Sequence, residues 1–179
     1  ARPPRIAMLV SSMGRGGAER VAAVLCNAWA AQGREVWLIP TYLGSRDLRF
    51  PLSPDVRLRF IGDLAEAPDH ARSGISWKIR TLRHWLGRVR PDVVVSFLPN
   101  VSILAVAATR GLRVPVVACE RADPAGGVDM GWTLHVSRFF LYPLANCVTA
   151  QTEQAARRLR LRLPLCRRIA VIPNPLPDR

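Results

Sequence analysis

Acidic residues and lysine are scarce in this chain. Of its 179 residues, 26 are Lys or Arg and 13 are Asp or Glu, so the formal net charge is +13. Lys78 is the only lysine, which leaves arginine to carry nearly all of the positive charge. This imbalance predicts an anionic partner, and nucleic acid, a phosphosugar and an anionic lipid all meet that description.

Cysteine and histidine are too few and too scattered to predict a metal centre or a disulfide scaffold. The residues concerned are Cys26, Cys119, Cys147 and Cys166, with His70, His84 and His135. No CxxC pair occurs, and the first three cysteines lie in or beside apolar patterns, which is typical of buried free thiols in a reducing cytoplasm. We therefore expect no bound metal.

Long apolar runs are missing as well. The longest lipid-like run, Val101 to Ala108, is much shorter than the roughly 20 residues that a membrane-spanning helix needs. No signal peptide is visible either. Together these features predict a cytoplasmic protein.

Short apolar, β-prone runs alternate with helical stretches along the whole chain. This alternation predicts an α/β fold: one Rossmann-like domain with a mainly parallel sheet and helices on both faces. Strands are expected at Ile6 to Val10, Val36 to Ile39, Val56 to Phe60, Val93 to Phe97, Val114 to Cys119, Cys147 to Ala150 and Ile169 to Ile172. Helices are expected at Ala18 to Gln32, Ser76 to Arg88, Val101 to Arg110, Leu134 to Ala145 and Glu153 to Leu161. Residues 1–172 would form the domain, and the proline-rich residues 173–179 would begin a linker.

A glycine-rich turn joins the first expected strand to the first expected helix. Gly14, Gly16 and Gly17 stand in this turn. Strand, glycine turn and helix in this order place bare backbone N–H groups and a helix N-terminus at one edge of the sheet, which suits an anion. Close packing of the helix on the sheet is the alternative reason for the glycines.

Two well-known phosphate motifs do not fit this turn. A dinucleotide fingerprint needs a third glycine where the chain has Glu19, and the next expected strand is not followed by the acidic residue that would bind a ribose. A Walker loop needs Gly-Lys-Ser/Thr, and the turn has no lysine. The turn therefore predicts an anion site of another kind.

Four segments together resemble the amino-terminal domain of a retaining family-four glycosyltransferase of the glycosyltransferase-B architecture. They are SSMGRGGAERV at 11–21, PDVVVSFLPN at 91–100, VVACERADP at 116–124 and VIPNPLP at 171–177. The resemblance implies that this half binds the acceptor, while an absent carboxy-terminal domain holds the nucleotide sugar. That sugar is a co-substrate, so the resemblance implies no cofactor. By itself the chain is expected to be inactive.

The resemblance assigns roles at the carboxyl edge of the sheet. It implies that Gly16 and Gly17 approach the donor diphosphate. Arg20, one turn into the helix, is a candidate to add positive charge there, and a surface arginine with no ligand role is the alternative. Many relatives carry a histidine after the fifth strand, where this chain has Glu120 and Arg121, so these two are the candidate catalytic, cleft-facing residues. A local ion pair between them is the alternative.

The preceding expected strand supplies two weaker candidates. Ser96 and Asn100 stand near its end, at the edge where open α/β sheets bind ligands, so both are candidate acceptor or sugar contacts.

The segment ISWKIRTLRHWLGRVR at 75–90 predicts an amphipathic basic helix. Its apolar positions recur at steps of three and four, as in a helix that covers a sheet. Its basic and aromatic residues instead predict contact with anionic lipid headgroups. The candidate membrane-facing residues are Trp77, Lys78, Arg80, Arg83, Trp85 and Arg88.

Taken together, the sequence predicts the acceptor-binding half of a glycosyltransferase that moves a sugar to a lipid-linked or lipopolysaccharide-type glycan, peripheral on the inner face of the plasma membrane. The alternatives are a nucleic-acid-binding module and a non-catalytic phosphosugar-binding domain. Few aromatic residues and no helix-turn-helix or zinc-finger spacing argue against nucleic acid.

Overall fold

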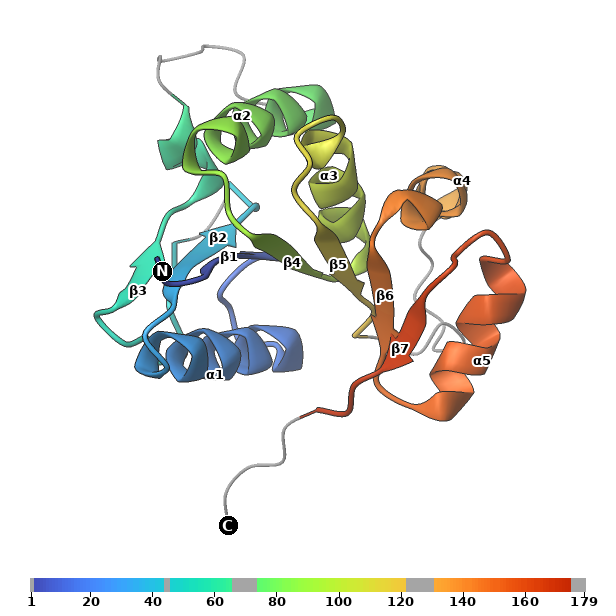
Figure 1. The fold of residues 1–179 in the computed structure, drawn as a ribbon, viewed down its shortest axis with the longest axis horizontal. Coiled ribbons are helices and arrows are strands. Elements are labelled where there is room, and N and C mark those ends of the chain that lie inside the picture. The colour runs from blue at the N-terminus through green and yellow to red at the C-terminus, as the bar shows by residue number, and fades with distance from the viewer. Residues whose placement is uncertain (1, 44–45, 66–73, 122–130, 175–179) are drawn as a thin grey trace.

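One parallel sheet of seven strands organises the molecule (Figure 1). The computed structural model describes residues 2–43, 46–65, 74–121 and 131–174. The strand order is β3-β2-β1-β4-β5-β6-β7. The strands are β1 Arg5–Val10, β2 Glu35–Pro40, β3 Val56–Leu58, β4 Val93–Phe97, β5 Val116–Cys119, β6 Cys147–Ala150 and β7 Ile169–Val171. The predicted Rossmann-like α/β class is confirmed.

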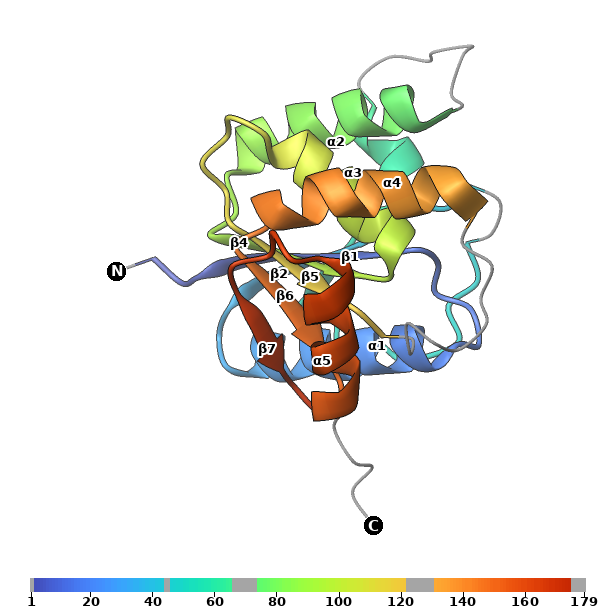
Figure 2. The same ribbon diagram turned by 90° about the vertical axis from the view of Figure 1, so that its right-hand side faces the viewer.

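Helices cover both faces of this sheet (Figure 2). They are α1 Gly17–Ala31, α2 Gly74–Val89, α3 Pro99–Thr109, α4 Gly131–Leu141 and α5 Glu153–Arg162, with short 3-10 helices η1 Ile61–Leu64 and η2 Tyr142–Leu144. Helix α1 packs on one face, against β1, β2 and β3. Right-handed crossovers place α2 to α5 on the opposite face, because each leads to a strand farther along the same direction of the sheet.

Alternation along β1 divides the core into two layers. Ala7 and Leu9 pack in the cluster that contains α2 and α3 residues. Met8 and Val10 pack in the cluster that contains α1 residues. Side chains of successive strand residues point to opposite faces, so a strand buried on both faces is apolar at every position. This explains the unbroken apolar run from which the strand was predicted.

The observed boundaries differ from the predicted ones mainly at prolines. Helix α3 begins at Pro99 rather than Val101, since proline suits the first turn of a helix, where its missing N–H is not needed. Helix α4 ends at Leu141 and continues as η2, because Pro143 has no N–H to extend the α-helical pattern. Strand β5 begins at Val116, after Pro115. Most of the predicted loop from 63 to 74 and residues 175–179 lie outside the described residues.

The strand order creates a crevice between β1 and β4. Strands β1 and β4 are neighbours in the sheet. The connection after β1 leads to β2 on one side, and the connection after β4 leads to β5 on the other side, so the two connections diverge. In open α/β sheets, ligands bind at such a point, beyond the carboxyl ends of the strands.

The cysteines provide a test of this core. Burial raises the pKa of the Cys26 thiol to about 12 and that of Cys119 to about 11. Both are buried, whereas Cys147 and Cys166 are half-buried. We expect a disulfide reagent at neutral pH to modify Cys147 and Cys166 first, and Cys26 and Cys119 only after denaturation, because the thiolate is the reactive form. Mass spectrometry of the labelled peptides measures this order, and rapid labelling of Cys26 in the native protein would contradict the packing of α1.

Candidate functional site

A cavity of about 350 Å³ opens at this crevice. Its walls come from the start of α1, from the residues that follow β4, β5 and β6, and from the chain beyond β7. The lining residues are Gly17, Ala18, Glu19, Leu98, Arg121, Gln151 and Asn174. The cavity therefore lies where the topology places a ligand site, and it collects residues that are far apart in the sequence.

The N-terminus of α1 forms one wall without a side-chain cap. Gly16 is the N-cap residue, with φ −78° and ψ 159°, and as a glycine it makes no side-chain cap hydrogen bond. Helix N-termini carry partial positive charge and unpaired N–H groups, so this wall favours an anion. The two glycines predicted to approach a diphosphate, Gly16 and Gly17, are both exposed, and Gly17 lines the cavity. Gly16 and the exposed Arg20, one turn farther on, do not line it.

Glu19 folds back over this turn. Its side chain is buried, and Ser12 donates a hydrogen bond to its Oε1 atom at 3.2 Å. A Cβ atom added at Gly16 would collide with the Glu19 carboxylate, whereas one added at Gly17 meets nothing within 4 Å. Gly16 is therefore required for the position of Glu19, and Gly17 leaves open space at the cavity.

Leu98 lines the cavity in an uncommon backbone conformation. Its φ is +76° and its ψ is 148°, which an L-residue with a side chain rarely adopts. Such residues cost about 1–3 kcal/mol and cluster at ligand sites. Leu98 is held there because it is the N-cap of α3, where the chain turns directly from β4 into the helix.

Among the described residues that line this cavity, Arg121 alone carries a guanidinium. Its Cζ atom stacks 4.2 Å from the ring centroid of Phe97. Its Nε and Nη2 atoms are buried and have no hydrogen-bond partner within the part of the chain that the structure describes. Burial lowers the pKa of Arg121. A desolvated cation with unused donors favours binding of an anionic group, such as a phosphate.

Glu120 lies on the other side of the sheet from Arg121. Strand alternation directs Glu120 toward α4, where it forms an ion pair with Arg138 at 3.2 Å and accepts a hydrogen bond from the Tyr142 hydroxyl. Burial raises the pKa of Glu120, against the opposing effects of Arg138 and Tyr142. The prediction that Glu120 faces the cleft is therefore wrong, and its ion pair is with Arg138 rather than with Arg121.

The two residues predicted from the region of β4 also separate. Ser96 is fully buried and donates to Ser102 Oγ at 3.0 Å, so its predicted contact with an acceptor is wrong. The strand turns this side chain toward α3. Asn100 is exposed in the first turn of α3, at the carboxyl edge of the sheet.

The predicted basic helix α2 exists, but its residues face in different directions. Trp77 is only 4% exposed and packs in the core, so its predicted membrane contact is wrong. Trp85 is half-buried and makes an edge contact with Trp37. Arg83 donates to the carbonyl oxygens of Ala108 and Arg110 at the end of α3.

The remaining basic residues of α2 differ in exposure. Arg80 and Arg88 are exposed, and Lys78 is half-buried. Only part of the predicted basic surface of this helix is therefore available to a partner.

Five lining residues were not predicted as site residues: Ala18, Glu19, Leu98, Gln151 and Asn174. The last two contact each other, since Gln151 Nε2 donates to Asn174 Oδ1 at 3.1 Å. Leu98, Gln151 and Asn174 each stand just after a predicted strand, and that position is the signal that sequence reasoning had available. Across the described residues, no three His, Cys, Asp or Glu side chains gather as a metal site, and no helix is long and apolar enough to cross a membrane.

Comparison with known proteins gives one curated relative of defined activity. The chain is 27% identical over 170 residues to GalNAc-alpha-(1->4)-GalNAc-alpha-(1->3)-diNAcBac-PP-undecaprenol alpha-1,4-N-acetyl-D-galactosaminyltransferase from Campylobacter jejuni. The match covers 90% of this chain and 46% of the relative. The chain therefore spans about half the length of this enzyme.

Solved structures show the same fold at low sequence identity. Sucrose-phosphate synthase from Thermosynechococcus elongatus superposes with a TM-score of 0.71 at 14% identity, covering 94% of this chain and 48% of that one. HepE from Anabaena, in complex with UDP and glucose, superposes with a TM-score of 0.67 at 14% identity, covering 97% of this chain and 45% of that one. MurG from Acinetobacter baumannii superposes with a TM-score of 0.59 at 16% identity, covering 97% of this chain and 47% of that one.

A family model decides the classification. The model described as Glycosyltransferase Family 4 matches residues 15–178, which is most of the chain and includes every residue that lines the cavity. The chain belongs to Glycosyltransferase Family 4.

Proposed function

We propose that this chain is the acceptor-binding half of an enzyme that transfers a sugar from a nucleotide sugar to a lipid-linked glycan. The cavity between the α1 N-terminus and Arg121 is the observation that carries the proposal. Family membership supports the reaction type, and the Campylobacter relative supports a diphosphate-linked polyprenol as the class of acceptor.

The proposed role of the cavity follows from its charges. Arg121 and the uncapped helix N-terminus favour a phosphate group, as the departing diphosphate of a nucleotide sugar provides. Glu19 repels such a group and is an acceptor for hydroxyl hydrogens. We therefore assign the phosphate to the space between Arg121 and Gly17 and a sugar hydroxyl to the Glu19 carboxylate, with Asn100 as a further acceptor contact.

The division into two domains is part of the proposal. Residues 1–172 would form the acceptor-binding domain, and a second domain would hold the nucleotide. The exposed Arg80 and Arg88 of α2, together with Arg83, would approach anionic headgroups, so that the enzyme works at the inner surface of the plasma membrane.

The chain by itself is expected to bind a nucleotide sugar weakly. One charge-assisted hydrogen-bonding group contributes about 1.5–3 kcal/mol, and a helix N-terminus about 0.3–1 kcal/mol. A dissociation constant of about 1 mM requires 4.1 kcal/mol, so titration of the chain with UDP-sugars should give a weaker value. Calorimetry measures this, and micromolar affinity would contradict the proposed division of labour.

The complete enzyme that contains this chain tests the reaction. Transfer from a panel of radiolabelled nucleotide sugars to a polyprenyl diphosphate glycan should place label in the organic phase. The complete enzyme with Leu161→Ser, a change at a side chain 83% exposed on α5, is a matched control and should keep wild-type transfer. Absence of transfer from every donor of the panel, with donor hydrolysis also absent, would contradict the proposal.

A further inference from the structure

Helix α4 has its charge inside and its aromatic residues outside. Its only charged residue, Arg138, is 3% exposed and paired with Glu120. Trp132 is 79% exposed and Phe140 65% exposed, on the side of the helix away from the sheet. Surface helices normally show the reverse arrangement, with a charged solvent side.

The exposed aromatic residues share one face of the helix. At 100° per residue, positions 132, 139 and 140 fall within about one quarter of the helical circumference, opposite Arg138. Phe139 is 38% exposed and stacks edge-on against Phe140. Leu144, 45% exposed in η2, follows just after this face. We call these four residues, Trp132, Phe139, Phe140 and Leu144, the α4 aromatic face.

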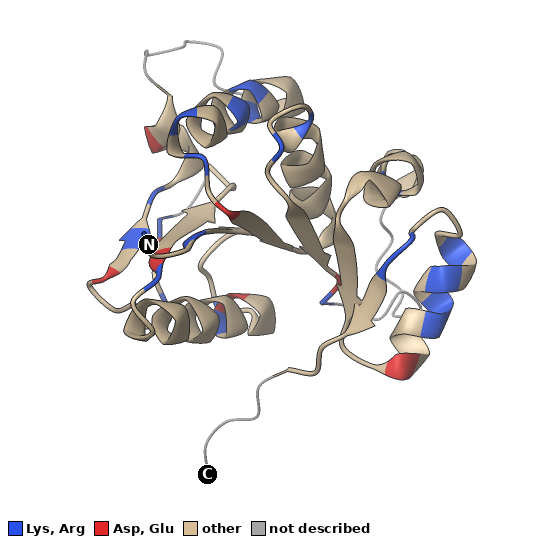
Figure 3. Ribbon diagram, in the orientation of Figure 1, with Lys and Arg blue, Asp and Glu red and all other residues tan. Residues whose placement is uncertain are grey.

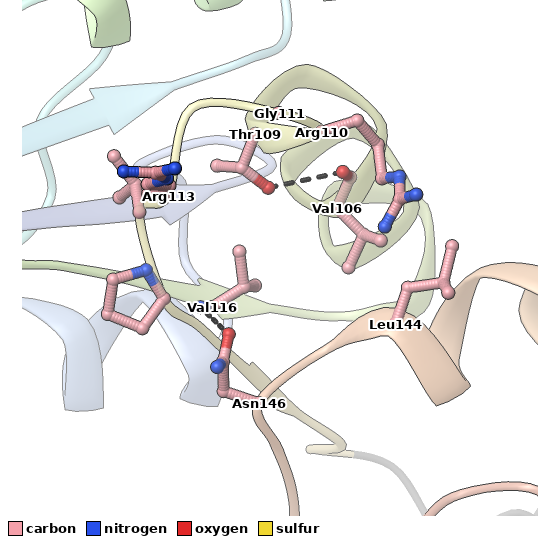
Figure 4. A pocket seen from close by; sticks show the side chains of 10 residues that line it. Val106, Thr109, Arg110, Gly111, Arg113, Val116, Leu144 and Asn146 are labelled. Carbon is pink, nitrogen blue, oxygen red and sulfur yellow. Dashed lines mark hydrogen bonds between the residues drawn. The ribbon is translucent and has the colours of Figure 1, made fainter.

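Arginines lie next to this face on one side, in a cavity of about 460 Å³ at the amino edge of the sheet (Figure 4). Leu144 belongs to its lining together with Arg110 and Arg113. Figure 4 shows Arg110 on the same side of this cavity as Leu144, with Arg113 across from it. Both arginines are exposed, so positive charge stands immediately beside an apolar side chain.

Helix α5 follows α4 in the chain, and its ribbon has several blue segments in Figure 3. Glu153 is the one acidic residue within 131–174. Besides Arg138, this part of the chain has arginines at 157, 158, 160, 162, 167 and 168. The α4 aromatic face is therefore next to Arg110 and Arg113 at its Leu144 end, and the chain that follows it is strongly basic.

We propose that the α4 aromatic face, with Arg110 and Arg113, binds an anionic lipid bilayer. Tryptophan and phenylalanine insert at the boundary between headgroups and acyl chains, and flanking arginines attract anionic headgroups. A second copy of this chain, at a formal net charge of +13, would bring like charges together, so the charge favours lipid over self-association. The surface is separate from α2 and does not depend on the transfer reaction.

Vesicle co-sedimentation tests this surface. The chain should bind vesicles of equimolar phosphatidylcholine and phosphatidylglycerol at low salt, and bind pure phosphatidylcholine far less. Trp132→Ser/Phe140→Ser should lower the partition coefficient by about tenfold or more, because two exposed aromatic side chains no longer enter the bilayer. Arg110→Gln/Arg113→Gln should weaken binding and reduce its dependence on salt.

Matched variants separate this surface from its competitors. Val24→Ser changes an exposed apolar residue on α1, which covers the opposite face of the sheet, and should leave binding unchanged. Trp132→Phe should still bind, but bromine-labelled lipids should quench its tryptophan emission less than that of the wild type. Thermal melts verify that each variant folds.

Three results would overturn the proposal. The first is unchanged vesicle binding by the Trp132→Ser/Phe140→Ser variant. The second is a loss of vesicle binding in an Arg80→Gln/Arg88→Gln variant of α2 while the α4 variants bind as well as the wild type. The third is light scattering that shows a dimer in the wild type and a monomer after the α4 substitutions, since the face would then bind a second copy.

Discussion

Replacing Arg138 with alanine should destabilise this protein by about 3–5 kcal/mol, the largest effect on stability that we expect from a single substitution. Arg138 is 3% exposed and Glu120 is 4% exposed. Without the guanidinium, the Glu120 carboxylate keeps the Tyr142 hydroxyl but loses its counter-charge within the interior. For a chain of this size, the melting temperature should fall by about 6–20 °C.

Removing both charges together is the control for this prediction. In Glu120→Gln/Arg138→Met no ion remains buried, so most of the lost stability should return. Chemical unfolding of Glu120→Gln, Arg138→Met and the double variant yields the coupling energy between the residues. Additive losses in the double variant would contradict a direct interaction.

The pH dependence of stability has a defined sign at this pair. Burial raises the pKa of Glu120 in the folded state above its ordinary value, so folding disfavours the ionised carboxylate. The stabilising contribution of Glu120 to the free energy of unfolding should therefore grow as pH falls through its raised pKa. It should be complete below the pKa that Glu120 has in the unfolded chain. The free energy of unfolding of wild type minus that of Glu120→Gln, measured across pH, isolates the contribution of Glu120. Asp92 contributes equally to both proteins; its pKa is lowered, so its contribution is lost on acidification.

The arrangement of strands and helices was largely predictable because each one has a local sequence pattern. Buried strands such as β1 are continuous apolar runs, and β4 and β6 have the predicted boundaries. The turn before α1 was recognisable because several glycines between a strand and a helix leave the backbone N–H groups of the helix start uncovered. Boundaries failed where proline removes an N–H donor, which shifts a helix end by a few residues.

Side-chain direction was the part that the sequence did not predict. Glu120 and Arg121 are adjacent in the sequence, but strand alternation sends them to opposite faces of the sheet. Which one faces the cavity depends on Arg138, a residue of α4 that pairs with Glu120 only in the folded chain. The same limit applies to α2, where periodicity predicted a covering helix but did not show that Trp77 turns into the core.

The two arginines near the end of β5 show how structure separates a stabilising residue from a binding residue. Arg138 has a carboxylate partner in the interior. Arg121 lines the cavity, and its buried Nε and Nη2 atoms have no hydrogen-bond acceptor among the residues described. A desolvated charge without an acceptor opposes folding, so its removal should cost little stability. The expected consequences of substituting these two residues are therefore opposite.

In the complete enzyme, Arg121→Ala should lower kcat/KM for transfer by about 10–150-fold, the equivalent of about 1.5–3 kcal/mol for a charge-assisted phosphate contact. The melting temperature of the same variant should stay within a few degrees of wild type or rise. Arg121→Lys should recover part of the activity, because it restores the charge without the planar pair of donors. Phe97→Leu removes the ring that Arg121 stacks on and should give a smaller loss. If Arg121→Ala instead unfolds the protein and leaves kcat/KM intact at low temperature, Arg121 belongs to the core and the cavity binds its anion through the α1 N-terminus alone.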